Sequence, residues 1–387
     1  MNKVTLKVDQ IIPQGTDAVE LVFLDEQNRI KNFWPGQFIT LLLNIEGKSV
    51  RRSYSICSVP EDLPRIAVCV KKVEGGQASH FLNKQLHEGD RLEVLEPYGN
   101  FSLNYKSAGL SDLVLVGAGS GITPLLSMLK SALAHAQNRV CLIYGSRSYR
   151  DILFINEINS LCASYPGRLR VEHFLSREPN DGCRTGRIAT DSIMQTIESW
   201  SDLNIQEANF YLCGPKGMMD EVEAGLKSHQ IDPNRVHRES FVLTVSEQKA
   251  ENSASTSAQT TATLAQSTAT LAQSTATPVQ SAAASAQSAA TSVQSSHTVQ
   301  IILEGRTHAL DVAAGRHILE TALDAGLDLP YACTMGVCGM CRAFKVSGDM
   351  EIGEQEALSR SEIEQGYCLT CVGKPLSDQL VIDYDRR

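Results

Sequence analysis

The feature that most constrains this chain is a segment that cannot fold on its own. Residues 249–297 are almost entirely Ala, Ser, Thr and Gln, with one proline and no aromatic residue, so they cannot bury enough apolar surface to form a core. The segment repeats every seven residues, as Thr261-Ala-Thr-Leu-Ala-Gln-Ser does at Thr268. A coiled coil is nevertheless not expected, because the apolar positions change to Ala, Ser and Pro and no flanking charges accompany them. We expect a flexible linker that spans about 40 Å on average and lets the C-terminal part swing.

The rest of the chain divides into two blocks before the linker and one after it, and 387 residues are enough for three domains. In residues 1–107, short strands separated by Gly and Pro turns predict an antiparallel β-barrel. In residues 108–248, strands and helices alternate, which predicts an α/β domain with a parallel sheet. Residues 298–387 begin with a hairpin and continue with an amphipathic helix near Ile318–Ala325. The strands expected are Thr40–Leu43, Arg65–Val70 and Asp90–Leu95 in the first block, Leu113–Val116, Val140–Tyr144, Leu169–Phe174 and Phe210–Cys213 in the second, and Val299–Leu303 and His308–Val312 in the third.

Charge and hydropathy exclude some classes of function. The net charge is −9 and no basic stripe is present, so nucleic-acid binding is not expected. No apolar run is long enough to span a bilayer, and the first residues alternate like a strand and lack the apolar stretch of a signal peptide, so we expect a cytoplasmic protein without membrane insertion. Val299–Arg387 carries 8 Lys and Arg against 14 Asp and Glu, which suits either a docking face for a basic partner or a solvated surface.

The cysteines separate into two groups. In a chain without an export signal, eleven cysteines argue against a disulfide framework. The single cysteines in apolar stretches, namely Cys57, Cys69, Cys141 and Cys162, are expected to be inert and buried.

The C-terminal cysteines are spaced for a metal group. Cys333, Cys338 and Cys341 have the C-x₄-C-x₂-C spacing of plant-type [2Fe–2S] ferredoxins, with Cys371 as the fourth thiolate. Cys338, Cys341, Cys368 and Cys371 also form a C-x₂-C…C-x₂-C set that is able to hold zinc. The iron–sulfur interpretation is favoured because zinc leaves Cys333 unexplained. Gly336 and Gly339 would let the loop wrap closely and aim N–H groups at the sulfurs.

Two glycine-containing turns have the context of phosphate-binding sites. Gly75-Gly76-Gln-Ala-Ser79 opens a helix that offers backbone N–H groups, together with the Ser79 hydroxyl, to a pyrophosphate. Gly117-Ala-Gly119-Ser-Gly121-Ile-Thr123-Pro124 follows an apolar strand and opens another helix.

The coenzyme is predicted from charge. After the strand Val140–Tyr144 come Gly145-Ser146-Arg147, and no acid appears until Asp151, whereas NADH sites usually place a carboxylate at this point. NADPH is therefore favoured over NADH, although Arg147 is equally able to stack on adenine in an NADH enzyme.

Several motifs resemble the ferredoxin–NADP reductase superfamily. Arg52-Ser53-Tyr54-Ser55 is similar to its R-x-Y-S signature, which implies FAD with Arg52 at the pyrophosphate, Tyr54 against the isoalloxazine and Ser55 near N5. The glycine loop would meet the nicotinamide end, with Thr123 near it. Other implied positions are Cys213 of Cys213-Gly214-Pro215 close to nicotinamide C4, Ser176 and Arg177 at the 2′-phosphate, and Glu239-Ser-Phe241 as the closing motif, with Phe241 on the flavin face. Ser55, Cys213 and Glu239 are thus the implied catalytic residues.

The last block, including Pro330-Tyr-Ala-Cys333 and Gly366-Tyr-Cys-Leu-Thr-Cys371, resembles plant-type ferredoxin domains of β-grasp fold. The order of the three domains resembles the reductase components of multicomponent oxygenases, among them the reductase subunits of phenylacetyl-CoA epoxidases. This resemblance implies electron flow from NAD(P)H through FAD and the cluster to an oxygenase, hydroxylase or desaturase. The alternatives are a stand-alone quinone or ferric reductase, a reductase of a hybrid-cluster protein, and, outside enzymes, a redox-sensing binding protein.

Overall fold

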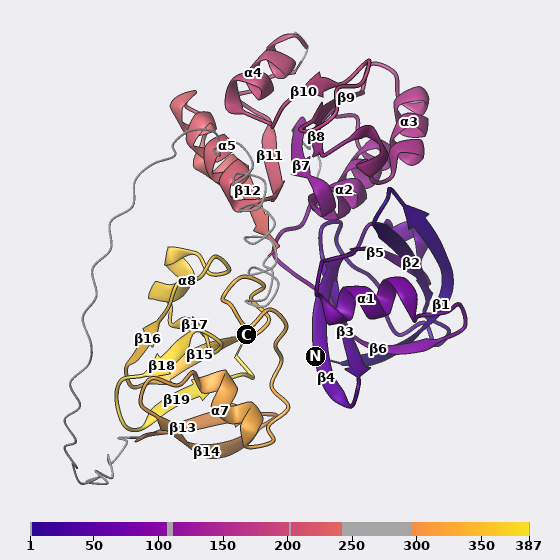
Figure 1. Ribbon diagram of the computed structural model, residues 1–387. Helices are drawn as coiled ribbons and strands as arrows, with labels where there is room; N and C mark the ends of the chain where they lie inside the picture. The colour runs from indigo at the N-terminus through magenta and orange to yellow at the C-terminus, as the bar shows by residue number, and fades with distance from the viewer. Residues whose placement is uncertain (1, 107–110, 201–202, 242–295, 387) are drawn as a thin grey trace, which may run out of the picture.

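The computed structural model describes residues 2–106, 111–200, 203–241 and 296–386, which form three domains (Figure 1). The predicted linker lies outside these residues, apart from Ser296 and His297, which begin a strand. The second domain lies above the first and third, which lie side by side (Figure 1). Among the described helices, none is long and apolar enough to cross a membrane.

The first domain is an antiparallel sheet of six strands in the order β4-β3-β6-β1-β2-β5. An isolated β-bridge pairs Ile56, just after β4, with Val68 of β5. Because β4 and β5 are the two edge strands, this bridge closes the sheet into the expected barrel. Its interior holds alternate strand residues such as Leu6, Phe23 and Ile39, all fully buried. The elements are β1 Lys3–Gln14, β2 Ala18–Leu24, β3 Phe38–Ile45, β4 Lys48–Ser55, β5 Arg65–Lys71 and β6 Arg91–Tyr98, with helices η1 Pro60–Asp62 and α1 Gln77–Lys84.

The second domain is a six-stranded sheet in the order β10-β9-β8-β7-β11-β12, with every pairing parallel. The parallel α/β prediction is confirmed. The strands are β7 Leu113–Ala118, β8 Val140–Ser146, β9 Leu169–Leu175, β10 Arg184–Thr185, β11 Asn209–Gly214 and β12 Val236–Ser240. The helices are η2 Gly119–Gly121, α2 Ile122–His135, η3 Tyr149–Asp151, α3 Ile155–Ser164, α4 Thr190–Glu198, α5 Lys216–Ser228 and η4 Pro233–Arg235.

The third domain combines a mixed sheet in the order β14-β13-β19-β15-β17 with the small ladder β16-β18. The hairpin β13–β14 is antiparallel and β13 pairs in parallel with β19, while α7 packs its buried residues Ile318, Leu319 and Ala322 into the core. The elements are β13 Ser296–Leu303, β14 Arg306–Ala313, α7 Ile318–Asp324, β15 Arg342–Ser347, β16 Met350–Ile352, α8 Arg360–Glu364, β17 Tyr367–Leu369, β18 Gly373–Pro375 and β19 Leu380–Asp383.

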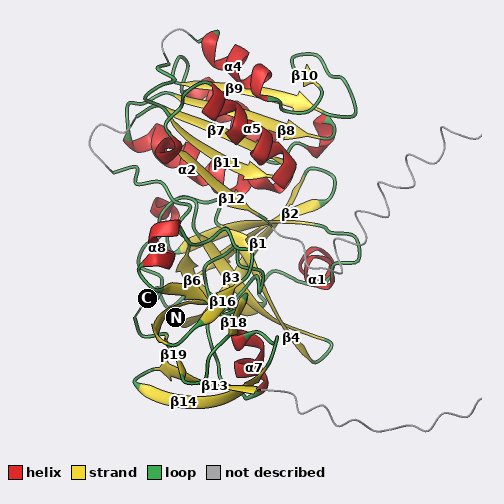
Figure 2. Cartoon of the chain, turned by 90° about the vertical axis from the view of Figure 1, so that its left-hand side faces the viewer, coloured by secondary structure: helices red, strands yellow, loops and turns green. Residues whose placement is uncertain are grey.

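The first and second domains share one apolar core. Phe101 and Leu103, which follow the last barrel strand, are buried in the same cluster as Leu125 and Met128 of α2. The end of β4 meets β12, where Ser55 donates to Glu239, and β12 lies on the side of the second domain that faces the first (Figure 2).

Candidate functional site

Four of the C-terminal cysteines lie next to one another. Cys333, Cys338 and Cys341 belong to the loop between α7 and β15, and Cys371 follows β17. Hydrogen bonds from the thiols of Cys338 and Cys371 lower the pKa of Cys333, and a hydrogen bond from Cys371 lowers that of Cys341. Cys341 and Cys371 are buried, whereas Cys333 and Cys338 are half-buried. The contacts run from Cys338 through Cys333 and Cys371 to Cys341, so the four thiols form one connected cluster. Four thiolates suit both a [2Fe–2S] group and a zinc ion, so the choice between these groups depends on which cysteines take part.

Backbone N–H groups of the same loop point at the sulfurs. The amides of Met335 and Cys338 donate to Cys333 Sγ at 3.4 and 3.3 Å, and that of Gly336 donates to Cys371 Sγ at 3.3 Å. Gly336 has φ +75° and Gly339 has φ +69°, a backbone conformation that favours glycine. The loop is therefore built to surround negatively charged sulfur.

Cys368 is separate from this group. It lies on β17, its thiol donates to the carbonyl oxygen of Ala343 at 3.5 Å, and burial raises its pKa to about 12. The zinc set needs Cys368 and leaves out Cys333, whereas the structure joins Cys333 to the other three and turns Cys368 into the core. The ordinary cysteines behave likewise: burial raises the pKa of Cys57 and Cys141.

The residues of the R-x-Y-S motif lie on β4, which pairs with β3. Ser53 bonds the Thr40 hydroxyl at 2.9 Å, and Arg52 donates to its neighbour's carbonyl at 2.8 Å. Tyr54 is half-buried against the barrel core. Ser55, at the strand end, is buried and donates to Glu239 Oε2 at 3.4 Å. The structure thus brings Ser55 of the first domain to Glu239 of the second.

The Glu239 carboxyl has a raised pKa. The residue keeps some exposed surface, but burial of its carboxyl raises its pKa to about 8, and the hydrogen bond from Ser55 offsets this only in part. Cys213 on β11 pairs in register with Glu239 on β12. Burial raises the pKa of Cys213 well above its ordinary value, with a further contribution from the Glu239 charge. The three residues implied as catalytic therefore meet at one point, where the carboxyl is neutral at pH 7.

The turn before α1 fits a phosphate group through its backbone. Gly76 is the N-cap of α1 and no side chain caps the helix, so first-turn N–H groups remain for an anion. Ser79 differs from expectation. It is buried, and its hydroxyl bonds Val73 and Gly76 within the turn. Its hydroxyl shapes the turn and does not face outward.

The glycine loop after β7 packs directly against the Cys213-Gly214-Pro215 segment. A Cβ on Gly121 would lie 2.0 Å from the Cys213 carbonyl oxygen, so only glycine allows this contact. Gly119 has φ +56°, and Pro215 is the N-cap of α5. Thr123 is buried and donates to the Ser120 carbonyl at 3.0 Å; like Ser79, it holds its own turn.

The two arginines expected near the coenzyme have different surroundings. Arg147 pairs with Asp17 at 2.8 Å and with Asp151 at 3.1 Å, so its guanidinium joins the first and second domains instead of standing ready to stack on adenine. Arg177 is exposed at the end of β9, next to Ser176, whose hydroxyl donates to the Ser146 carbonyl at 3.3 Å. Phe241, which follows β12, is 39% exposed.

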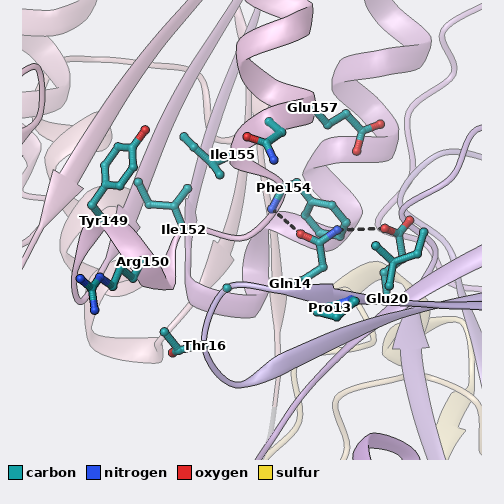
Figure 3. A pocket seen from close by; sticks show the side chains of 13 residues that line it. Pro13, Gln14, Thr16, Glu20, Tyr149, Arg150, Ile152, Phe154, Ile155 and Glu157 are labelled. Atoms are coloured by element: carbon teal, nitrogen blue, oxygen red, sulfur yellow. Dashed lines mark hydrogen bonds between the residues drawn. The ribbon is translucent and has the colours of Figure 1, made fainter.

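A cavity of about 690 Å³ also lies between the first two domains, at the β1–β2 turn and the start of α3 (Figure 3). Gln14 crosses it, accepting from the Phe154 amide at 3.0 Å and donating to Glu20 at 3.0 Å. None of the predicted site residues lines this cavity.

Sequence reasoning missed the surface on which the third domain docks. Arg51 of β4 donates to Asp328 Oδ1 at 2.7 Å and to the Leu329 carbonyl at 3.3 Å, and its guanidinium lies 4.2 Å from the ring centroid of Tyr331. Lys3 reaches the other Asp328 oxygen at 2.8 Å. The sequence does hold a signal for this surface. Arg51 precedes Arg52 on the same strand, and neighbouring strand residues face opposite sides, so Arg51 has to meet a partner other than that of Arg52.

The apolar part of this docking surface lies at the cysteine loop. Ala332 and Met340 are buried against Phe38 and Leu95 of the barrel, with Cys338 packed at the edge. Tyr98 donates to the Gly339 carbonyl at 3.4 Å. Phe38 is the register partner of Ser55, so one pair of strand residues separates the cysteine loop from the Ser55–Glu239 contact.

Comparisons with known proteins agree with this arrangement. Residues 3–103 match the oxidoreductase FAD-binding domain, 115–224 the oxidoreductase NAD-binding domain, and 301–376 the 2Fe-2S iron-sulfur cluster binding domain. The three predicted cofactors are thereby confirmed, and the zinc alternative is set aside.

Several relatives match this chain over nearly their whole length. The sequence is 32% identical to the ferredoxin reductase component of 3-ketosteroid-9-alpha-monooxygenase from Rhodococcus rhodochrous, covering 98% of this chain and 97% of the relative. It is 29% identical to one of the subunits of 1,2-phenylacetyl-CoA epoxidase from Escherichia coli K12, covering 99% and 98%. Phthalate dioxygenase reductase has the same fold, with a TM-score of 0.57, 22% identity and coverage of 99% and 98%.

Proposed function

Because the chain belongs to the family of oxygenase reductase components with FAD-, NAD- and 2Fe-2S-binding domains, we propose that it delivers electrons from NADPH to an oxygenase in the cytoplasm. The observation that carries this proposal is the docking surface, which holds the cysteine loop against β3, one register pair from Ser55. Flavin and cluster ligands are thus neighbours in one chain.

We assign the residues as follows. Arg52, Ser53, Tyr54 and the Gly76 turn hold FAD; Ser55, Cys213 and Glu239 surround the point of hydride transfer; Gly119, Gly121, Thr123, Gly214 and Pro215 shape the nicotinamide end, with Phe241 as the cover of the flavin; and Cys333, Cys338, Cys341 and Cys371 hold the cluster. FAD supplies the exchange between two-electron and one-electron chemistry, and the cluster carries single electrons. The chain contributes orientation and a neutral Glu239 carboxyl that adds no charge at pH 7.

The preference for NADPH rests on Arg177. Arg177 is exposed and follows Ser176 at the end of β9, and no ion pair of its side chain is found among the described residues. Arg147, in contrast, is already paired with two carboxylates. A dianionic 2′-phosphate suits such a cation.

A cytoplasmic location is supported by chemistry. All eleven cysteines are unpaired, which suits a reducing compartment, and NADPH is supplied there. Fractionation of cells that produce the tagged protein tests this part of the proposal, and recovery outside the cytoplasm would contradict it.

The experiment that tests the function combines composition with turnover. Purified protein should contain FAD, iron and acid-labile sulfide in the ratio of one flavin to one [2Fe–2S] group. With NADPH it should reduce both ferricyanide and a purified oxygenase. Cys371→Ser should keep the first activity and lose the second. If this variant still feeds the oxygenase at the full rate, the cluster is not on the electron path, and a stand-alone reductase takes the place of this proposal.

A further inference from the structure

The Glu356 side chain of the third domain contacts two residues of the second domain. The Ser240 hydroxyl donates to one carboxylate oxygen, and Lys216 Nζ lies 3.6 Å from the other. Both contacts come from the ends of elements that carry the hydride-transfer residues. Ser240 follows Glu239 on β12, and Lys216 follows Pro215 at the start of α5.

On its other side, Glu356 belongs to the loop that supports the cysteines. Its amide donates to the Gly336 carbonyl at 3.0 Å, and the amide of Ala357 donates to the same oxygen at 3.2 Å. The Gly336 amide in turn donates to Cys371 Sγ.

The contact between these two loops is close. A Cβ on Gly336 would lie 2.9 Å from both the Gln355 side chain and the Glu354 carbonyl oxygen. A displacement of residues 354–357 therefore has to move Gly336, and with it the N–H group that donates to Cys371.

We propose that Glu356 is a positioning residue for electron transfer from FAD to the cluster. Its carboxylate fastens the cluster loop to the hydride-transfer end of the second domain, and its backbone transmits that position to the Gly336–Cys371 hydrogen bond. This inference rests on the proposed function, and it adds a second attachment point that is independent of Arg51 and Asp328 on the barrel.

The size of the effect follows from exposure. The Glu356 side chain is 33% exposed and that of Lys216 is 70% exposed, so the ion pair alone is weak, and the Ser240 hydrogen bond to a charged acceptor carries most of the contact. Because the contact is exposed, we expect less than the full value of a hydrogen bond to a charged group, so loss of the side chain should slow cluster reduction by about three- to tenfold.

The test is anaerobic mixing of the holoenzyme with NADPH, following flavin and cluster absorbance in the same record. Glu356→Ala should slow cluster reduction and leave flavin reduction as the internal reference. Glu354→Ala is the matched control. It removes an exposed acid from the same loop, and the Glu354 carboxylate has no ion pair or hydrogen bond among the described contacts. Glu356→Gln, which still accepts from Ser240, should recover most of the rate.

A charge exchange provides the second readout. Glu356→Lys alone should be slow, and Glu356→Lys combined with Lys216→Glu should be faster than either single variant. A redox titration followed by electron paramagnetic resonance should show a shifted cluster potential in Glu356→Ala and none in Glu354→Ala.

The outcomes separate cleanly. Wild-type cluster reduction in Glu356→Ala, or equal slowing in Glu354→Ala, overturns the assignment. If NADPH fails to reduce the cluster even in the unmodified protein, the proposed function itself fails, and that result is distinct from the first two.

Discussion

Arg51 attaches the third domain to the barrel through three contacts, and its removal should uncouple the cluster from the flavin. The side chain is 12% exposed, pairs with Asp328, bonds the Leu329 carbonyl and covers the Tyr331 ring. Lys3 and Arg51 both donate to Asp328 and hold its pKa below the ordinary value, so the carboxylate is charged at neutral pH. Arg51→Ala removes all three contacts at once.

The magnitude follows from the exposure of each partner. A hydrogen bond to a charged group contributes about 1.5–3 kcal/mol, and a cation–π contact about 0.5–1 kcal/mol at an exposed site. The Asp328 side chain is 58% exposed and keeps Lys3 as a second cation, so the lower ends of both ranges apply. The docking equilibrium should weaken by about 2 kcal/mol, which corresponds to roughly a 30-fold lower ratio of docked to undocked protein.

The assay is the rate of cluster reduction after flavin reduction, measured from low to high salt. Unmodified protein should slow as salt rises, because screening weakens exposed ion pairs. Arg51→Ala should be slow throughout and should depend less on salt, with the remaining dependence coming from the Lys3–Asp328 and Lys216–Glu356 ion pairs. Arg65→Ala is the control, since Arg65 pairs with Asp9 on the same barrel and has no hydrogen bond or ion pair with the third domain among the described residues. Equal rates in the two variants would refute the attachment role of Arg51.

Three further predictions address the sites themselves. Cys333→Ser should abolish the [2Fe–2S] visible spectrum while Cys368→Ser keeps it; the reverse result would support zinc ligation. Arg177→Ala should raise KM for NADPH by roughly ten- to hundredfold with little change for NADH, the effect of one charged contact, and equal effects on both coenzymes would exclude a selecting role. Because the pKa of Glu239 is raised from 4.5 to about 8, the native flavin-free protein binds a proton that the unfolded chain releases, so stability should fall as pH rises from about 4.5 through 8. Glu239→Gln should flatten that dependence in denaturant unfolding, and an unchanged slope would contradict it.

The sequence predicted those features that depend on local pattern. The short apolar run Arg65–Val70, bounded by turns, predicted a barrel strand, and the glycine loop after Leu113–Val116 predicted a strand-to-helix turn. Helix α4 was missed although its signal is legible: Ile193, Met194 and Ile197 are its buried face, at spacings typical of an amphipathic helix.

Hydroxyl groups were less predictable than glycines. The motifs placed Ser79 and Thr123 at cofactor turns, but a buried hydroxyl bonds whichever backbone group is nearest, and here both bond their own turn. Arg147 was similarly ambiguous, because its partner Asp17 lies 130 residues away along the chain. No local pattern reveals which of two distant charges will meet.

The pair Arg51 and Arg52 shows where prediction from sequence ends. Alternation along β4 already requires that the two side chains face opposite sides of the strand, so if Arg52 binds the flavin, as we propose, Arg51 faces away from that site. The sequence cannot say what occupies that other side, because the occupant is Asp328, 277 residues later and beyond the linker. The same strand contacts the third domain through Arg51 on one face, while Arg52, which we propose binds FAD, lies on the opposite face. The β4 contacts of Arg51 and the Glu356 contacts with Ser240 and Lys216 are therefore the two places where a substitution should change the transfer step.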